Sequence, residues 1–282
     1  MAIRTIFSMA QDCARGERLG WQEFVRDYAG IARALLTHYF STLEPEMDEH
    51  VIAVFRRAAA HSGSWFVGLK FSNEREFMMA FHDLVLAYGR EQERVPAPPI
   101  TLDQVRTLVK DLTLLERELL WLIIKGYDGA RVAAIMMNAA ATVEAVQRIA
   151  DERLGSHHAN NRQAGDPALI ALAPGAAPGH PVISIAVLMS LAEQAKTDKC
   201  ASLKTFNNLV NGQISWRERE LAEEHMNDCF YCINRFTTFQ EMVRFRKDVP
   251  PLSEPRVEAI LAQIPIVARK PSGALSRLFT GR

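Results

Sequence analysis

Residues 200–232 read CASLKTFNNLVNGQISWRERELAEEHMNDCFYC, the most specific pattern in the chain. His225, Cys229 and Cys232 follow one another as H-x3-C-x2-C, and Cys200 lies 25 residues before the histidine. Three cysteines and one histidine are a ligand set typical of tetrahedral zinc. Because four protein ligands leave no position for a reactive water, we expect one structural zinc ion rather than a catalytic one.

The same residues allow two other interpretations. In one, Cys229 and Cys232 are buried thiols beside an unrelated histidine. In the other, the C-x2-C pair is a redox motif, although it does not follow a strand of a βαβ unit. The fourth cysteine, Cys13, stands alone before the first predicted helix, and we interpret it as an incidental thiol. Four cysteines in 282 residues are too few for a disulfide scaffold.

The sequence on both sides of this stretch has helical periodicity, and we predict an all-α fold. In the C-terminal part, Ser215 and Glu218 form a capping box at a helix start, and Pro250 ends the last long helix. Residues 16–91 place apolar side chains at spacings of three and four, which predicts three helices around one core. A short helix is expected at 257–264.

Residues 114–154 have the pattern of a helix-turn-helix motif. Their sequence, LLERELLWLIIKGYDGARVAAIMMNAAATVEAVQRIADERL, predicts helices over 114–125, 129–137 and 142–154. Asn138 is expected to adopt the left-handed conformation between the last two helices, and Thr142 to cap the third. Generic packing of three helices is the alternative interpretation of this pattern.

Composition divides the chain. Residues 155–181 contain 4 Gly, 4 Pro and 7 Ala, which is 15 of 27 residues, and we predict a flexible linker there because so little apolar surface cannot offset chain entropy. Three prolines between Pro96 and Pro99 mark a smaller break. The expected divisions are 1–95, 96–154, the linker 155–181, 182–248 and a tail at 249–282.

The metal-ligand stretch lies in a segment, 182–248, that resembles the zinc-binding anti-sigma domain. The shared pattern is an upstream cysteine, an apolar helix, a glycine turn, a charged helix and H-x3-C-x2-C. The resemblance implies a small zinc-binding helical bundle that binds a sigma factor and blocks its access to RNA polymerase.

The N-terminal half resembles an extracytoplasmic-function sigma factor. Residues 1–95 resemble its helical region 2, and DEHVIAVFRRA at 48–58 falls at the family's polymerase-binding helix. Residues 96–154 resemble the helix-turn-helix of region 4, with TVEAVQRIADERL at 142–154 in place of the recognition helix. The resemblance implies polymerase contacts at Glu49, Val51, Val54 and Phe55, and DNA contacts at Thr142, Gln147 and Arg148.

The charges are balanced over the chain but not within it. The 33 Lys and Arg residues match 33 Asp and Glu residues. Residues 1–155 carry 18 basic against 21 acidic residues, a net charge of −3, and residues 156–282 carry 15 against 12, a net charge of +3. The signs favour an intramolecular contact between the zinc domain and the sigma-like half, whereas an acidic surface repels phosphate.

Together these features lead to the hypothesis of a one-chain transcription regulator. Sigma-like domains would recruit the RNA polymerase core to promoter DNA, and the fused zinc domain would control them in cis. The alternative is an interaction or scaffold protein with degenerate sigma and anti-sigma architecture, which sequesters a regulator or binds polymerase without binding DNA. The residues that favour this alternative depart from the family's pattern: Ile52, Ala53, Glu144 and Val146.

Other classes find less support in the sequence. The chain has no G-x-G-x-x-G, Walker, H-E-x-x-H or G-x-S-x-G motif, and a zinc enzyme needs an open metal position, so we do not expect an enzyme. No apolar run reaches the length of a spanning helix, and residues 1–10 do not resemble a signal peptide. We therefore expect a cytoplasmic protein that does not bind membranes.

Overall fold

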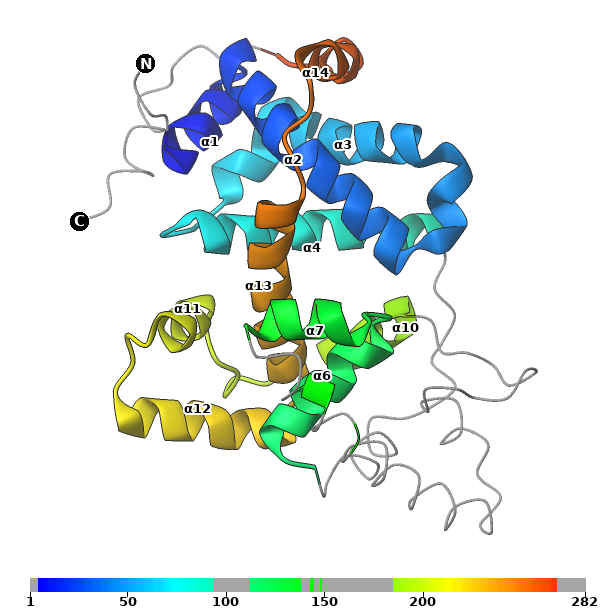
Figure 1. The fold of residues 1–282 in the computed structure, drawn as a ribbon. Helices are drawn as coiled ribbons and strands as arrows, with labels where there is room; N and C mark the ends of the chain where they lie inside the picture. Colours follow the sequence, from blue (N-terminus) through cyan, green and yellow to red (C-terminus); the bar gives the residue numbers. More distant parts are fainter. Residues whose placement is uncertain (1–4, 94–111, 138–142, 145–147, 149–184, 268–282) are drawn as a thin grey trace. The chain divides into compact units, whose positions relative to one another are not determined.

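The computed structural model describes residues 5–93, 112–137, 143–144, 148 and 185–267 (Figure 1). Within these residues every regular element is helical, which confirms the predicted all-α fold. The chain falls into two compact units, one formed by residues up to 93 together with those from 245 onward, and one formed by residues 94–244. None of the described helices is long and apolar enough to cross a membrane.

The first unit is built around an aromatic core. Phe24 is completely buried, and its ring centroid lies 4.9 Å from that of Phe55 and 5.0 Å from that of Phe66. Such tilted and edge-to-face contacts add to the apolar area that the rings bury. The helices of this unit are α1 (Ile6–Arg15), α2 (Arg18–Tyr39), the 3-10 helix η1 (Ser41–Glu46), α3 (Met47–Gly68), α4 (Glu74–Glu93), the end of α13 (Phe230–Asp248) and α14 (Glu254–Leu261).

Helix α1 corrects one prediction. We expected the first helix to begin near residue 16, with Cys13 before it, but Cys13 lies inside α1 and is buried. Its carbonyl accepts a hydrogen bond of 3.2 Å from the indole of Trp21. The start of α1 is marked by a capping box of Thr5 and Ser8. The more usual signature has Glu or Gln at the third helical position, which is why the pattern was missed.

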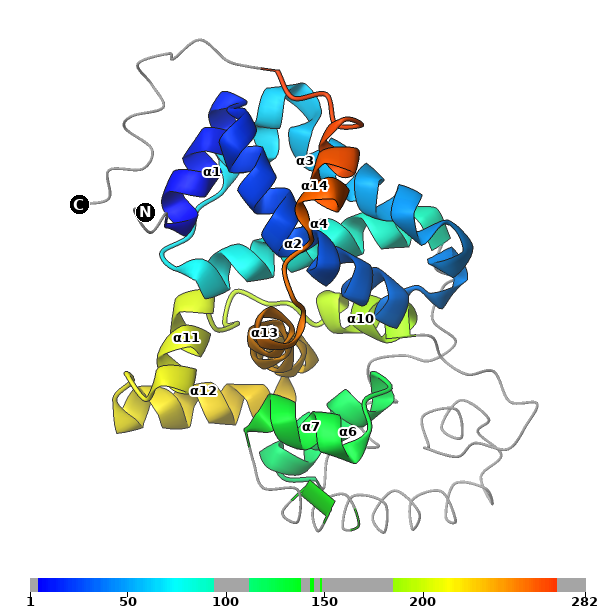
Figure 2. The ribbon, with the colours of Figure 1, turned by 45° about the horizontal axis from the view of Figure 1, so that its top comes forward.

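Residues 249–264, which we call the strap, pack against α2 (Figure 2). The Leu252 amide donates a hydrogen bond of 2.8 Å to the Arg26 carbonyl, and Val257 and Leu261 are buried. The helix begins at Glu254, three residues before the predicted start. The predicted tail therefore includes an ordered helix that belongs to the first unit, while residues 268–282 lie outside the described part.

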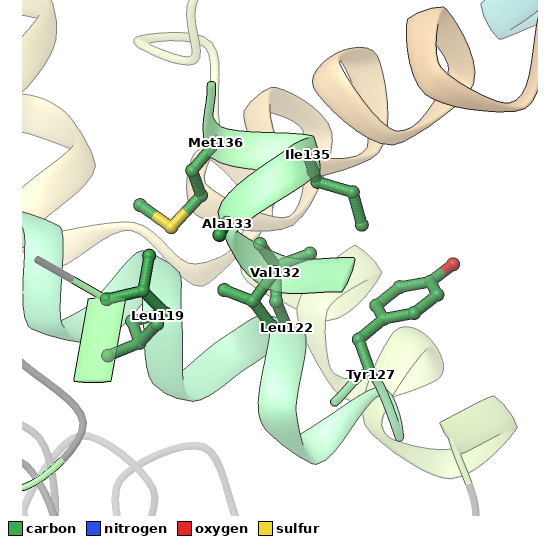
Figure 3. Close-up of a cluster of buried hydrophobic side chains, with 8 residues drawn as sticks. Leu119, Leu122, Tyr127, Val132, Ala133, Ile135 and Met136 are labelled. Carbon is green, nitrogen blue, oxygen red and sulfur yellow. The ribbon is translucent and has the colours of Figure 1, made fainter. Parts of the chain in front are cut away.

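The second unit contains a helix-turn-helix-like hairpin, whose two helices lie within residues 112–137, and the metal-ligand segment, residues 185–244. Leu122, Val132 and Ile135 are buried in the core of the hairpin (Figure 3). Met137 ends its second helix in the left-handed conformation with φ 54°. Asn138, for which this conformation was predicted, lies outside the described residues. The described helices are α6 (Leu114–Ile124), α7 (Gly129–Met136), α10 (Ile185–Gln194), α11 (Leu203–Asn211), α12 (Trp216–Asp228) and most of α13.

Close packing of α1 against α2 gives a test of the first unit. A Cβ atom at Gly20 would lie 2.5 Å from Asp12 Cβ and 2.9 Å from the Cys13 nitrogen, whereas one at Gly68 would meet nothing within 4 Å. We expect Gly20→Ala to lower the free energy of unfolding by about 1–3 kcal/mol, because backbone must move to admit the methyl group. Gly68→Ala is the matched control and should be neutral or stabilising by up to about 1 kcal/mol. Urea unfolding measures both, and a neutral Gly20→Ala would contradict this packing.

Candidate metal centre

Three adjoining elements of the second unit bring the four predicted ligands together. Cys200 lies in the turn between α10 and α11, and His225 lies in the last turn of α12. Cys229 joins α12 to α13, and Cys232 lies in the first turn of α13. The Ser215–Glu218 capping box is present at the start of α12, as predicted, so the sequence fixes where the helix that carries His225 begins.

The distances between the ligand atoms suit a single ion. One ligand atom from each of the four residues lies within 4.8 Å of all the others. The Sγ atoms of Cys200 and Cys229 are 3.6 Å apart, which is far beyond a disulfide bond. Two Zn–S bonds of about 2.3 Å at a tetrahedral angle place their sulfurs about 3.8 Å apart. The group could therefore hold a metal ion, and its geometry is compatible with zinc.

Burial supports the same conclusion. Cys229 and Cys232 are 5% and 0% exposed, and Cys200 and His225 are half-buried. The Nε2 atom of His225 is buried and has no hydrogen-bond partner among the described residues. A buried ring nitrogen without a partner loses the free energy of its hydration. A metal ion would supply the missing interaction.

The two buried thiols do not titrate alike. The pKa of Cys229 is lowered to about 5, chiefly by a hydrogen bond from Cys232, with further contributions from Cys200 and the charge of His225, while burial opposes the shift. The same hydrogen bond, together with burial, raises the pKa of Cys232. One thiolate is thus favoured by the protein alone, and a second requires a cation, which is how metal binding releases protons.

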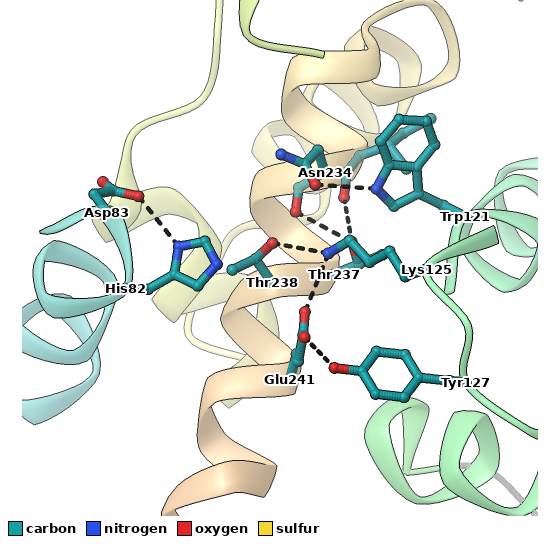
Figure 4. A network of polar contacts seen from close by, with 10 residues as sticks. His82, Asp83, Trp121, Lys125, Tyr127, Asn234, Thr237, Thr238 and Glu241 are labelled. Carbon is teal, nitrogen blue, oxygen red and sulfur yellow. Dashed lines mark hydrogen bonds and ion pairs between the residues drawn. The ribbon is translucent and has the colours of Figure 1, made fainter. Parts of the chain in front are cut away.

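A buried polar network that the sequence did not reveal joins α6 to α13 (Figure 4). The Lys125 ammonium donates to Thr238 Oγ1 at 3.0 Å and lies 3.1 Å from a carboxylate oxygen of Glu241. The Tyr127 hydroxyl donates to the other oxygen of the same carboxylate. Lys125 and Glu241 are each only 1% exposed, and burial lowers the pKa of the lysine while Glu241 opposes that shift.

Aromatic packing extends this network. The Trp121 indole donates a hydrogen bond of 3.0 Å to Asn234 Oδ1, and its ring lies 5.8 Å from that of Phe230, between centroids. These partners are more than 100 residues apart, so no local pattern predicts them. The only sign in the sequence is a lysine at the end of the apolar run LLWLIIK.

The predicted DNA contacts fall mostly outside the described residues. Thr142 and Gln147 are among the residues not described, and Arg148 is helical and exposed. Val143 is buried in the hairpin core, and Glu144 beside it is exposed.

The predicted polymerase contacts lie on α3 and differ in exposure. Glu49 is exposed, but Val51, Val54 and Phe55 are buried, and Phe55 belongs to the aromatic core. A partner that binds α3 in this conformation would reach Glu49 and not these three side chains.

A buried carboxyl group lies where α6 meets α12. Glu118 is 7% exposed, and burial together with the charge of Glu223 on α12 raises the pKa of Glu118 to about 8. The protonated carboxyl is therefore the favoured form in the folded unit at neutral pH.

The chain matches no protein family model, no curated protein and no solved structure.

Glu118 predicts a pH dependence. Because the pKa of Glu118 is higher in the folded than in the unfolded state, the folded state binds more protons between about pH 4.5 and 8, and stability falls as pH rises through that range. Between pH 5.5 and pH 8, we expect the free energy of unfolding of Glu118→Gln to fall by about 1–3 kcal/mol less than that of wild type, since one pKa unit corresponds to about 1.4 kcal/mol. Urea unfolding of both proteins at pH 5.5 and pH 8 measures the difference, and parallel pH profiles would show that Glu118 titrates normally.

The ligand set predicts a metal stoichiometry. We expect about one zinc per chain after purification with zinc, and at least a tenfold loss of zinc affinity in Cys229→Ser and Cys232→Ser, because a hydroxyl replaces a thiolate. Cys13→Ala is the matched control, since Cys13 is buried in the other unit. This variant should retain its zinc. Atomic absorption with a competing chelator measures both quantities, and full zinc retention in both serine variants would refute the assigned site.

Proposed function

We propose that this protein is a sigma-factor-like regulator of transcription initiation, controlled in cis by its own zinc-binding segment. In this proposal the helical N-terminal unit and the hairpin recruit RNA polymerase to promoter DNA. The segment that contains α10 to α13 binds one structural zinc ion and restrains the hairpin. The proposal rests on the resemblance of the sequence to sigma and anti-sigma domains, together with the contacts of the second unit.

The observation that carries the cis control is the buried pairing of α6 with α13. Lys125 and Tyr127, from the hairpin, share the carboxylate of Glu241, from the metal-ligand segment. A charge removed from water at such an interface is tolerated only while its partner is in place. The hairpin and α13 are therefore expected to stay together or to separate fully, which is the behaviour that an inhibitory contact requires.

The metal centre would give α13 a fixed starting point. Cys229 and Cys232 lie where α13 begins, and Cys200 ties that point to the turn before α11. Binding energy at a structural zinc site is folding energy for the segment around it. Loss of zinc is thus expected to loosen α13 and with it the contact to α6.

The covalent link strengthens any such restraint. The hairpin and the metal-ligand segment are joined by one continuous chain, so binding between them is intramolecular. Effective concentrations for short linkers are of the order of millimolar. Even a weak intrinsic affinity would then keep the restrained form dominant until a signal acts.

Charge favours one alternative. Residues 1–155 have a net charge of −3, and Glu144 is exposed beside the predicted DNA-contacting residues. Repulsion between this surface and phosphate would weaken promoter binding. In the alternative function the protein is a scaffold that binds polymerase or sequesters a regulator and does not read DNA.

Variants of Glu241 test the proposal in the full chain. Glu241→Gln leaves the Lys125 charge buried without a countercharge, at a cost of about 3–5 kcal/mol, so we expect transcription from a promoter library with purified polymerase to rise above wild type. The triple variant K125M/Y127F/E241L replaces the network by apolar groups and should keep transcription at or below wild type. Glu91→Gln, which breaks an exposed pair with Arg57, is the matched control and should change nothing.

The outcomes separate the two functions. Transcription that rises only in Glu241→Gln, with metal content and helicity unchanged, supports control in cis. Equal transcription above background from all the variants contradicts that control. Silence from every variant, with polymerase bound, favours the scaffold.

A further inference from the structure

The strap forms one wall of a partly open cavity in the first unit. The cavity has a volume of about 250 Å³ and is lined by α2, α3 and the strap. Its walls are largely apolar, and the strap contributes Leu252, Ala259 and Ile260. Val51 and Ile52 line it from α3. All of these elements belong to one unit, so the cavity does not depend on the placement of the other unit.

Two arginines give the cavity a positive edge. Arg33 on α2 pairs with Asp48 on α3, and Arg256 on α14 approaches the same carboxylate oxygen at 3.9 Å. That separation exceeds a hydrogen bond. The Asp48 carboxylate thus lies near two guanidinium groups. Arg256 has no other ion pair among the described residues. The balance of these three charges is positive.

The apolar interior and the positive edge together define the ligand. A guanidinium group binds a carboxylate through paired hydrogen bonds, which Arg256 is free to make beside Asp48. At about 30 Å³ for each water-sized group, the cavity holds a molecule of about eight to ten non-hydrogen atoms. Sites of this kind bury an apolar body and orient it by one or two polar groups.

We propose that the cavity between α2, α3 and the strap binds a small amphiphilic carboxylate, with its apolar body against Ile52 and Ile260 and its carboxylate on Arg256. Such a ligand would touch the strap and the two helices beneath it at once. It would therefore stabilise the strap in its docked position, since a ligand that binds only the folded form stabilises that form. The site is independent of the proposed role in transcription.

Hexanoate, which has eight non-hydrogen atoms, is the probe for the test. We expect titration of the full chain, labelled at isoleucine methyl groups, to give saturable chemical-shift changes at Ile52 and Ile260, with a Kd of about 1 mM or tighter. Ile233 in the other unit should not shift. Hexanol, which has no charge, and acetate, which has no apolar body, should each bind at least about tenfold more weakly.

Three variants decide the site. Arg256→Gln removes the anion partner, and Ala259→Phe fills the cavity from an exposed helical position, so each should weaken hexanoate binding about tenfold or more. Arg18→Gln breaks the exposed pair between Arg18 and Glu258, which joins α2 to α14 outside the cavity, and should leave the Kd unchanged. Absence of saturable shifts in wild type, or equal affinity in wild type and Ala259→Phe, would overturn the proposal.

Discussion

The buried pair of Lys125 and Glu241 is the constraint on which the second unit depends. Each of these charges is only 1% exposed, and a charge so buried is tolerated only while its partner is present. Thr238 and Tyr127 make further hydrogen bonds to the pair. The pair fixes which faces of α6 and α13 meet. It also explains why the hairpin and the metal-ligand segment, which the sequence suggests are separate domains, lie in one compact unit.

The metal centre and the polar network act on the same helix. Cys232 and Glu241 are nine residues apart on α13, which corresponds to about 14 Å along a helix. One end of α13 is therefore held by the ligand cluster, and a point less than three turns later is held by α6. Because a helix of this length is stiff, order at the metal centre is transmitted to the contact with the hairpin. This link is the route by which the proposed control of the hairpin would act.

Local patterns predicted local structure, and long-range pairing escaped them. The spacing of His225, Cys229 and Cys232 predicted the cluster, and the Ser215 capping box predicted the start of α12, because these interactions span three or four residues. The pairing of Lys125 with Glu241 and the docking of the strap on α2 join residues more than 100 positions apart, so periodicity carries no sign of them. Helical spacing also identified α3 without showing that most of its predicted contact residues are buried.

Hydrogen exchange of the full chain, with zinc bound and after chelation, tests the central claim that the metal centre restrains the hairpin through α13. Removal of zinc should speed exchange of the amides in α6 and α13 together, while those in α2 and α3, in the other unit, keep their protection. Faster exchange confined to the residues around Cys229, with α6 protected as before, would contradict the claim.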